Sequence, residues 1–221
     1  MSTSARLLLH GLADRFLNMA IDESLLREVS QPVLRFYRWS EADALSIGYF
    51  DSVSELPAAR PFVRRYTGGG LVDHARDFTY SVIVPKQHPL CQQGTSASYQ
   101  AIHEAVTQAL LEQGIGAELA PCCFEATSKA CFQKPVKYDV VQGQSKLAGA
   151  AQRRTREGCL HQGSILVHPI DVDSLRLSLT KTLGPLLAET LTPDQLTQSE
   201  EARAQTLREE RYSRDDWNFS R

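Results

Sequence analysis

The chain has 221 residues, of which 42% are hydrophobic and 23% are charged, and its formal net charge at pH 7 is −2. This composition is ordinary for a globular protein, so it excludes a disordered tail protein, a collagen-like fibre and a bundle of membrane helices. A charge so close to zero also argues against a function in nucleic-acid binding, which needs an excess of basic residues. The length favours a single domain over residues 1–221.

Five cysteines are present, an odd number in a chain too large to need disulfide staples. We therefore expect free thiols in a reducing compartment, and we expect Cys122 and Cys123 to be small buried side chains. Their spacing gives no metal site. The apolar run Leu7–Leu9 is too short for a secretory signal, and no run approaches the roughly 20 apolar residues of a membrane span. These features predict a cytoplasmic protein with no membrane partner.

The first half of the chain begins with a short strand at 6–10, followed by a helix at 15–28 for which Asp14 is the expected N-cap. Four further stretches are rich in aromatic and β-branched residues, which favour strands. They lie at 33–39, 44–49, 62–65 and 77–84.

The second half begins with a predicted helix at 96–113, where Tyr99, Ile102, Val106 and Leu110 repeat at helical spacing. Residues 120–135 have no clean period and indicate a loop. Strands follow at 138–141, 146–153 and 159–167, then helices at 171–183, with Gly184 as its stop, and at 193–212. Strands and helices do not alternate regularly, so we expect an α+β fold: a mixed, largely antiparallel sheet packed with helices.

Two small-residue runs stand out. The run Arg64–Gly70 ends in three glycines and is followed by His74, so a ligand could lie directly on backbone amides flanked by Arg65 and His74. The run Lys146–Arg153 carries four small residues, Ala148–Ala151, where a strand normally has bulky ones. Small residues in a strand leave room for a neighbouring backbone or a narrow apolar ligand.

Residues 129–156 hold seven Lys or Arg and one acid, a local charge of 7 − 1 = +6 in a chain of net charge −2. Such a stretch could receive an acidic partner or form a solvated surface. Cys131 lies within it, and nearby cations increase the thiolate fraction of a cysteine. Cys131 and Lys146 could thus form a thiolate–ammonium pair suited to acyl transfer, although these patterns do not favour Cys131 over Cys122 or Cys123.

The chain resembles the lipoate–protein ligase and octanoyltransferase family, whose catalytic domain is shared with biotin–protein ligases. Five segments carry the resemblance: Asn18–Glu23, Leu34–Tyr37, Leu45–Phe50, Arg64–Gly70 with His74, and Lys146 with Gly149–Gln152. The resemblance implies one catalytic domain of biotin/lipoate ligase type, without a C-terminal accessory domain. It also implies a substrate-binding set, namely Arg65, Thr67, Gly68, Gly69, Gly70, His74, Gly149, Ala150 and Ala151.

Within the family, the segment Cys131–Lys146 is similar to that of cysteine-dependent octanoyltransferases of Gram-positive type. This likeness implies that Cys131 and Lys146 are catalytic. An octanoyl group would pass from acyl carrier protein, through a thioester on the cysteine, to a lysine of a lipoyl-domain protein such as the glycine-cleavage H protein or a 2-oxoacid dehydrogenase E2. No metal or cofactor is then required.

Three alternatives stay open at this point. An ATP-dependent lipoate–protein ligase would need ATP and magnesium; an amidotransferase would act between two lipoyl proteins; a non-catalytic protein would only bind lipoyl domains. Two positions depart from the octanoyltransferase pattern. Gly70 stands where an arginine is often found, and Ala75 stands where an aspartate commonly follows the histidine.

Overall fold

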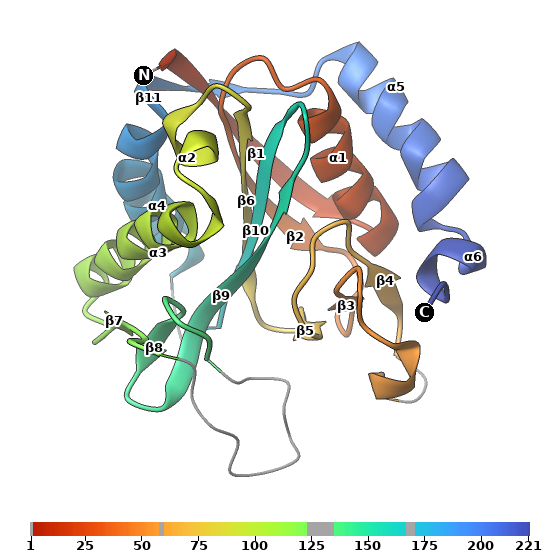
Figure 1. The fold of residues 1–221 in the computed structure, drawn as a ribbon, viewed down its shortest axis with the longest axis horizontal. Helices are drawn as coiled ribbons and strands as arrows, with labels where there is room; N and C mark the ends of the chain where they lie inside the picture. The colour runs from red at the N-terminus through yellow and green to blue at the C-terminus, as the bar shows by residue number, and fades with distance from the viewer. Residues whose placement is uncertain (1, 58–59, 123–134, 167–170) are drawn as a thin grey trace.

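The computed structural model describes residues 2–57, 60–122, 135–166 and 171–221 (Figure 1). Its main element is an eight-stranded sheet with the order β11-β1-β2-β6-β10-β9-β8-β7. The strands are β1 (Ser2–Ala13), β2 (Val33–Trp39), β6 (Phe78–Pro85), β7 (Glu118–Leu119), β8 (Val140–Gln142), β9 (Ser145–Arg154), β10 (Gly158–Ile165) and β11 (Ala188–Asp194). Strand β1 is parallel to β11 and β2, and every other pair is antiparallel. The mixed, largely antiparallel sheet is confirmed.

Helices cover both faces of this sheet. Successive side chains of a strand point to opposite faces, and neighbouring residues of these strands are both apolar and buried. Leu34, for example, packs into the core beneath α3 and α4, and Val33 packs into the core beneath α1 and α5. The α-helices are α1 (Arg15–Arg27), α2 (Pro89–Gln92), α3 (Thr95–Glu112), α4 (Val172–Leu187), α5 (Gln198–Leu207) and α6 (Asp215–Asn218). Figure 1 shows α2, α3 and α4 at one side of the sheet and α1 with α5 at the other.

A second sheet of three short strands lies beside the large one and has the order β4-β3-β5. Its strands are β3 (Leu45–Ile47), β4 (Phe62–Arg64) and β5 (Val72–Asp73). The glycine run joins β4 to β5, so this small sheet presents the loop toward β9 and β10 (Figure 1).

A buried polar cluster ties α1 to the strands of the large sheet. The Asp22 carboxylate is fully buried and forms a 2.6 Å ion pair with the fully buried Arg35. Its other oxygen accepts hydrogen bonds from Ser81 Oγ (2.6 Å) and Gln162 Nε2 (2.7 Å). These partners come from β2, β6 and β10, so the cluster fixes the strands on which the candidate site is built.

Two sequence predictions were wrong near the C-terminus. Helix α4 does not stop at Gly184 but continues through Pro185 to Leu187, because Leu183 and Leu187 are buried in the core. Residues 193–212 are not one helix. Pro193 lies in β11, which is an edge strand beside β1. The missing N–H of a proline is tolerated in an edge strand. Helix α5 begins only at Gln198.

Candidate active site

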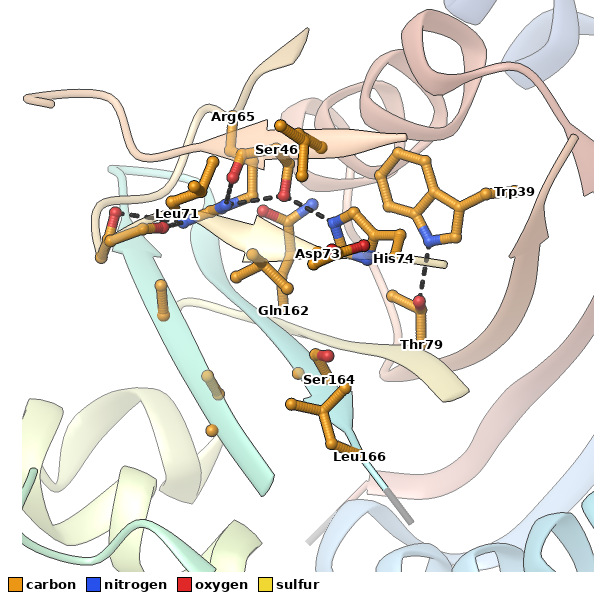
Figure 2. Close-up of a pocket in the computed structure, with 18 of the residues that line it drawn as sticks. Trp39, Ser46, Arg65, Leu71, Asp73, His74, Thr79, Gln162, Ser164 and Leu166 are labelled. Carbon is orange, nitrogen blue, oxygen red and sulfur yellow. Dashed lines mark hydrogen bonds between the residues drawn. The ribbon is translucent and has the colours of Figure 1, made fainter. Parts of the chain in front are cut away.

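A cavity of about 770 Å³ lies between the small sheet and strands β9 and β10 (Figure 2). Met19, Leu45, Leu71 and Leu166 give part of its wall an apolar character. Eight residues of the set predicted from the sequence line it: Arg65, Gly69, Gly70, His74, Lys146, Gly149, Ala150 and Ala151. The fold therefore brings the loop of three glycines, Gly68–Gly70 (the glycine loop), and strand β9 with Lys146 (the lysine strand) together around one cavity.

Thr67 and Gly68 do not line this cavity. Thr67 is fully buried, and its hydroxyl donates to Gln162 Oε1 at 2.7 Å. The Gly68 carbonyl accepts from Arg65 at 3.0 Å. Both residues therefore lie outside the cavity lining, and their hydrogen bonds to Gln162 and Arg65 hold the loop in place.

Arg65 shapes the glycine loop from beneath. One guanidinium nitrogen donates to the Ser46 carbonyl (2.8 Å) and hydroxyl (2.7 Å), and the other donates to the carbonyls of Gly68, Gly69 and Gly70 at 2.8 to 3.1 Å. Burial lowers the pKa of Arg65 to about 10, which leaves the group cationic at neutral pH. The loop is thus organised around a buried positive charge.

The loop carbonyls and its N–H groups point in opposite directions, since a trans peptide sets them antiparallel. Because three carbonyls face Arg65, the N–H groups of Gly69, Gly70 and Leu71 face away from it. None of these N–H groups has a hydrogen-bond partner among the described residues. Adjacent free N–H groups of this kind can bind an oxyanion. The backbone of Gly69 has φ +80°, which glycine adopts without strain.

His74 is fixed by contacts on both nitrogens and on its ring face. Its Nδ1 donates to Asp77 Oδ2 at 2.7 Å. Its Nε2 accepts from Ser46 Oγ at 2.6 Å, and its ring stacks on Trp39 with centroids 3.8 Å apart (Figure 2). Ser46 resembles the serine of a hydrolytic triad, but it is fully buried, so the arrangement orients His74 and does not present a nucleophile.

His74 was expected from the sequence, whereas Ser46 and Asp77 were not. Asp77 supplies the histidine with a carboxylate whose side chain is buried, a role that Ala75 cannot fill. The only local signal was an acid three residues after the histidine.

Lys146 reaches the cavity from β9 and forms a 2.8 Å ion pair with the fully buried Asp139. The aliphatic end of this lysine lies directly over Gly149. A Cβ at position 149 would come within 2.2 Å of Lys146 Cε and 2.4 Å of its Nζ. The small-residue run therefore makes room for the lysine side chain as well as for a ligand.

The backbone N–H of Ala150 is not available to an oxyanion. It donates to the Tyr99 hydroxyl at 3.0 Å, on the side away from β10. Oxyanion donors in this cavity are therefore better sought in the glycine loop than in β9.

Cys131 lies outside the described residues, as does Cys123. Cys91 and Cys159 are buried, and burial raises the pKa of the Cys159 thiol to about 11. Cys122 is exposed, which corrects the expectation that it packs in the core.

The basic stretch does not form one continuous surface where it is described. Lys146 lies in the cavity, and Arg154 donates to the Cys91 and Leu90 carbonyls, so both have local roles. Arg153 lies against the rings of Tyr49 and Tyr66. The fold thus separates basic residues that are close together in sequence.

The part of the chain that the structure describes contains no helix long and apolar enough to cross a bilayer. It also contains no group of three or more His, Cys, Asp or Glu side chains placed to hold a metal ion.

The sequence matches the family model described as lipoyl protein ligase A/B catalytic domain over residues 14–211. Among curated proteins, it is 34% identical to the octanoyltransferase LipM of Symbiobacterium thermophilum, over 99% of both chains. It is 30% identical to octanoyltransferase LipM of Brevibacillus brevis, over 93% of this chain and 95% of that protein. It is 38% identical to octanoyltransferase LipM of Staphylococcus aureus, over 75% of this chain and 66% of that protein.

Two solved structures have the same fold as this chain. A lipoate–protein ligase A bound with ATP superposes with a TM-score of 0.81 at 25% identity, over 99% of both chains. A Thermoplasma acidophilum bipartite lipoate protein ligase, described together with its E2 lipoyl domain, superposes with a TM-score of 0.75 at 23% identity, over 99% of this chain and 97% of that one.

Proposed function

We propose that this chain, which belongs to the lipoyl protein ligase A/B catalytic domain family, is an octanoyltransferase that acts through a thioester on Cys131. Membership confirms the resemblance seen in the sequence. The relatives named octanoyltransferase LipM support octanoyl transfer in protein lipoylation. The observation that carries the proposal is the cavity itself, because Lys146 enters a partly apolar space that is also bordered by the glycine loop.

The cavity can hold an acyl chain with its carbonyl near Lys146. Met19, Leu45, Leu71 and Leu166 supply apolar surface, and burial of each methylene of an acyl chain contributes about 0.8 kcal/mol. Gly163 in the cavity wall has no side chain, and a Cβ there would come within 2.2 Å of the Tyr80 ring. Gly163 therefore leaves room for the Tyr80 ring, which packs against this part of the wall.

In the proposed first half-reaction, the Cys131 thiolate attacks the thioester carbonyl of octanoyl-acyl carrier protein. The Lys146 ammonium stabilises that thiolate before attack. The N–H groups of Gly69 and Gly70, which have no partner among the described residues, are the candidate donors to the oxyanion. When the tetrahedral intermediate collapses, the carrier thiolate leaves and takes a proton from Lys146. The products are octanoyl-Cys131, the carrier thiol and a neutral Lys146.

In the second half-reaction, the neutral amine of a lipoyl-domain lysine attacks octanoyl-Cys131. An amide bond forms, the carbon–sulfur bond breaks, and the Cys131 thiolate leaves. The neutral Lys146 accepts the proton released by the amine, which restores the starting thiolate and ammonium. Conversion of a thioester to an amide is downhill, so the proposed reaction needs neither ATP nor a metal.

The proposed partners are acyl carrier protein as donor and a lipoyl-domain protein as acceptor. The Thermoplasma acidophilum ligase described with its E2 lipoyl domain is consistent with an acceptor of this kind. A catalytic thiol must stay reduced, so the proposal retains the cytoplasmic location expected from the sequence.

An ATP-dependent ligase is the second candidate, because a lipoate–protein ligase A bound with ATP has the same fold at 25% identity. The test is octanoylation of a purified lipoyl domain under two conditions. One reaction contains octanoyl-acyl carrier protein without ATP, and the other contains octanoate, ATP and magnesium.

The transferase predicts modification in the first reaction, loss of it in Cys131→Ala, and near wild-type activity in the matched control Cys122→Ala. Modification only in the second reaction, with Cys131→Ala fully active, would assign the ligase instead.

A further inference from the structure

Two residues on α3 face the ion pair of Lys146 and Asp139 from outside the cavity. Tyr99 and His103 are four residues apart, so they lie on the same side of the helix with their rings 4.2 Å apart. We propose that they are positioning residues, which hold Asp139 in place and through it the Lys146 ammonium. This inference rests on the proposed function of Lys146.

Tyr99 acts on the carboxylate of Asp139. Its hydroxyl donates a short hydrogen bond to Asp139 Oδ1, while Oδ2 accepts from the Val136 N–H (2.8 Å) and pairs with Lys146 (2.8 Å). The carboxylate is fully buried, so three donors replace the water it has lost. Burial and the Asp139 charge raise the pKa of Tyr99, which keeps the phenol protonated as a donor.

Tyr99 also ties Asp139 to the lysine strand. Strand β8 pairs with β9 only as far as Ala148, so beyond that residue no strand of the described part of the chain lies beside this edge of β9. The Tyr99 hydroxyl fills this position by accepting from the Ala150 N–H. One phenol therefore fixes the carboxylate and the strand segment that carries Lys146 relative to each other.

His103 acts on the backbone that precedes Asp139. Its Nδ1 donates to the Tyr138 carbonyl at 2.6 Å. Tyr138 has φ +71°, a left-handed conformation that a bulky residue adopts only when its surroundings impose it. The hydrogen bond from His103 stabilises this conformation, which directs the next side chain, Asp139, toward Lys146.

The groups around Asp139 leave Lys146 as its one cationic partner among the described residues. Burial lowers the pKa of His103 to about 4, and it lowers the pKa of His161 on β10 well below the ordinary value. Burial raises the pKa of Tyr80 on β6. All three are neutral at neutral pH, so the charge next to Lys146 is set by Asp139.

The test compares Tyr99→Phe with Tyr212→Phe, a matched control. Tyr212 is also a buried tyrosine that donates to a buried carboxylate, that of Glu23, but it packs against α1 and α5. The readout is the rate of Cys131 acylation per active chain as the concentration of octanoyl-acyl carrier protein is varied. Loss of the phenol leaves Asp139 Oδ1 without this donor, so the carboxylate and the Lys146 ammonium that it pairs with are no longer held in one position.

For Tyr99→Phe we expect about a tenfold lower maximal rate per active chain, with an unchanged half-saturating donor concentration. A structural role alone would lower the fraction of chains that can be acylated without lowering the rate of the active fraction. A maximal rate per active chain equal to those of wild type and Tyr212→Phe would overturn the inference.

A second pair of variants tests His103. Asn can place an amide N–H near the position of Nδ1, whereas Leu cannot. His103→Asn should therefore keep most of the acylation rate, and His103→Leu should lose about tenfold. Equal rates in the two variants would contradict the role of the hydrogen bond to Tyr138.

A third readout needs no octanoyl donor and separates this inference from the proposed function. Acetylation of Lys146 by acetic anhydride is followed with time, at one fixed pH, by peptide mass spectrometry. The acetylation rate of Lys146 should be higher in Tyr99→Phe than in wild type, because the carboxylate is no longer held against the ammonium. If wild type takes no octanoyl group yet the acetylation rate differs between the two proteins, only the proposed function fails. Equal acetylation rates refute the positioning role.

Discussion

Substitution of Gly149 by alanine should disable Lys146 while leaving the fold intact. The new Cβ would lie 2.2 Å from Lys146 Cε and 2.4 Å from Nζ. Carbon atoms in contact are separated by about 3.5 Å, so the end of the lysine must move by roughly 1.3 Å. A misplacement of about 1 Å in a catalytic group can cost about 100-fold in rate. We therefore expect the acylation rate of Cys131 to fall about 100-fold in Gly149→Ala.

The assay is single-turnover acylation by octanoyl-acyl carrier protein, quenched in acid and read by intact mass. Because the displaced atoms end a flexible side chain, the unfolding midpoint should stay within a few degrees of wild type. Gly11→Ala is the matched control, since it also lies in a strand and its added Cβ would meet nothing within 4 Å. Wild-type acylation in Gly149→Ala would refute the position or the role that we assign to Lys146.

Three further predictions concern stability. Arg65→Lys should lower the free energy of unfolding by on the order of 3 kcal/mol in urea titrations, because one ammonium cannot replace the hydrogen bonds to Ser46 and three loop carbonyls. Asp22→Asn should cost roughly 3–5 kcal/mol in the same assay, since it leaves the fully buried Arg35 without its counter-ion. The free energy of unfolding should fall as the pH is lowered from about 6.5 toward about 4, because His103 has the lower pKa in the folded state and the unfolded chain binds its proton first. Thermal melts across this range should show a shallower fall in His103→Asn.

Each stability prediction has a contradicting result. Unfolding of Arg65→Lys at the wild-type urea concentration would mean that the loop does not depend on the guanidinium. A change below about 1 kcal/mol in Asp22→Asn would mean that the pair is solvated. Parallel melting curves for wild type and His103→Asn between pH 6.5 and 4 would remove His103 from the acid response.

The sequence predicted best those elements whose signals are local. Helix α1 and its Asp14 cap were found because the capping residue and the apolar spacing are adjacent in sequence, and the carboxylate does accept from Phe16 and Leu17. Strand β2 was found at its observed bounds from its aromatic and β-branched residues. Strand β11 was missed because Ala188–Asp194 has little strand propensity and becomes a strand only beside β1.

The residues of the candidate site likewise differ in how well local sequence predicts them. The glycine run, His74 and Lys146 lie in recognisable motifs, and the structure places them around one cavity. Asp77 was missed because it belongs to no recognised motif. Ser46 was missed because its place in the Leu45–Phe50 segment does not reveal that its hydroxyl contacts His74. Tyr99 fitted the apolar face of a helix, and only the packing of α3 against β9 shows that its hydroxyl serves Asp139 and Ala150.

The measurement that tests the central claim most directly is the intact mass of the protein after mixing with octanoyl-acyl carrier protein in the absence of ATP. We predict a gain of one octanoyl group that is removed by hydroxylamine, is absent in Cys131→Ala and persists in Cys122→Ala. Failure of the wild-type protein to gain mass, while a lipoyl domain in the same mixture becomes octanoylated, would contradict a thioester on this enzyme.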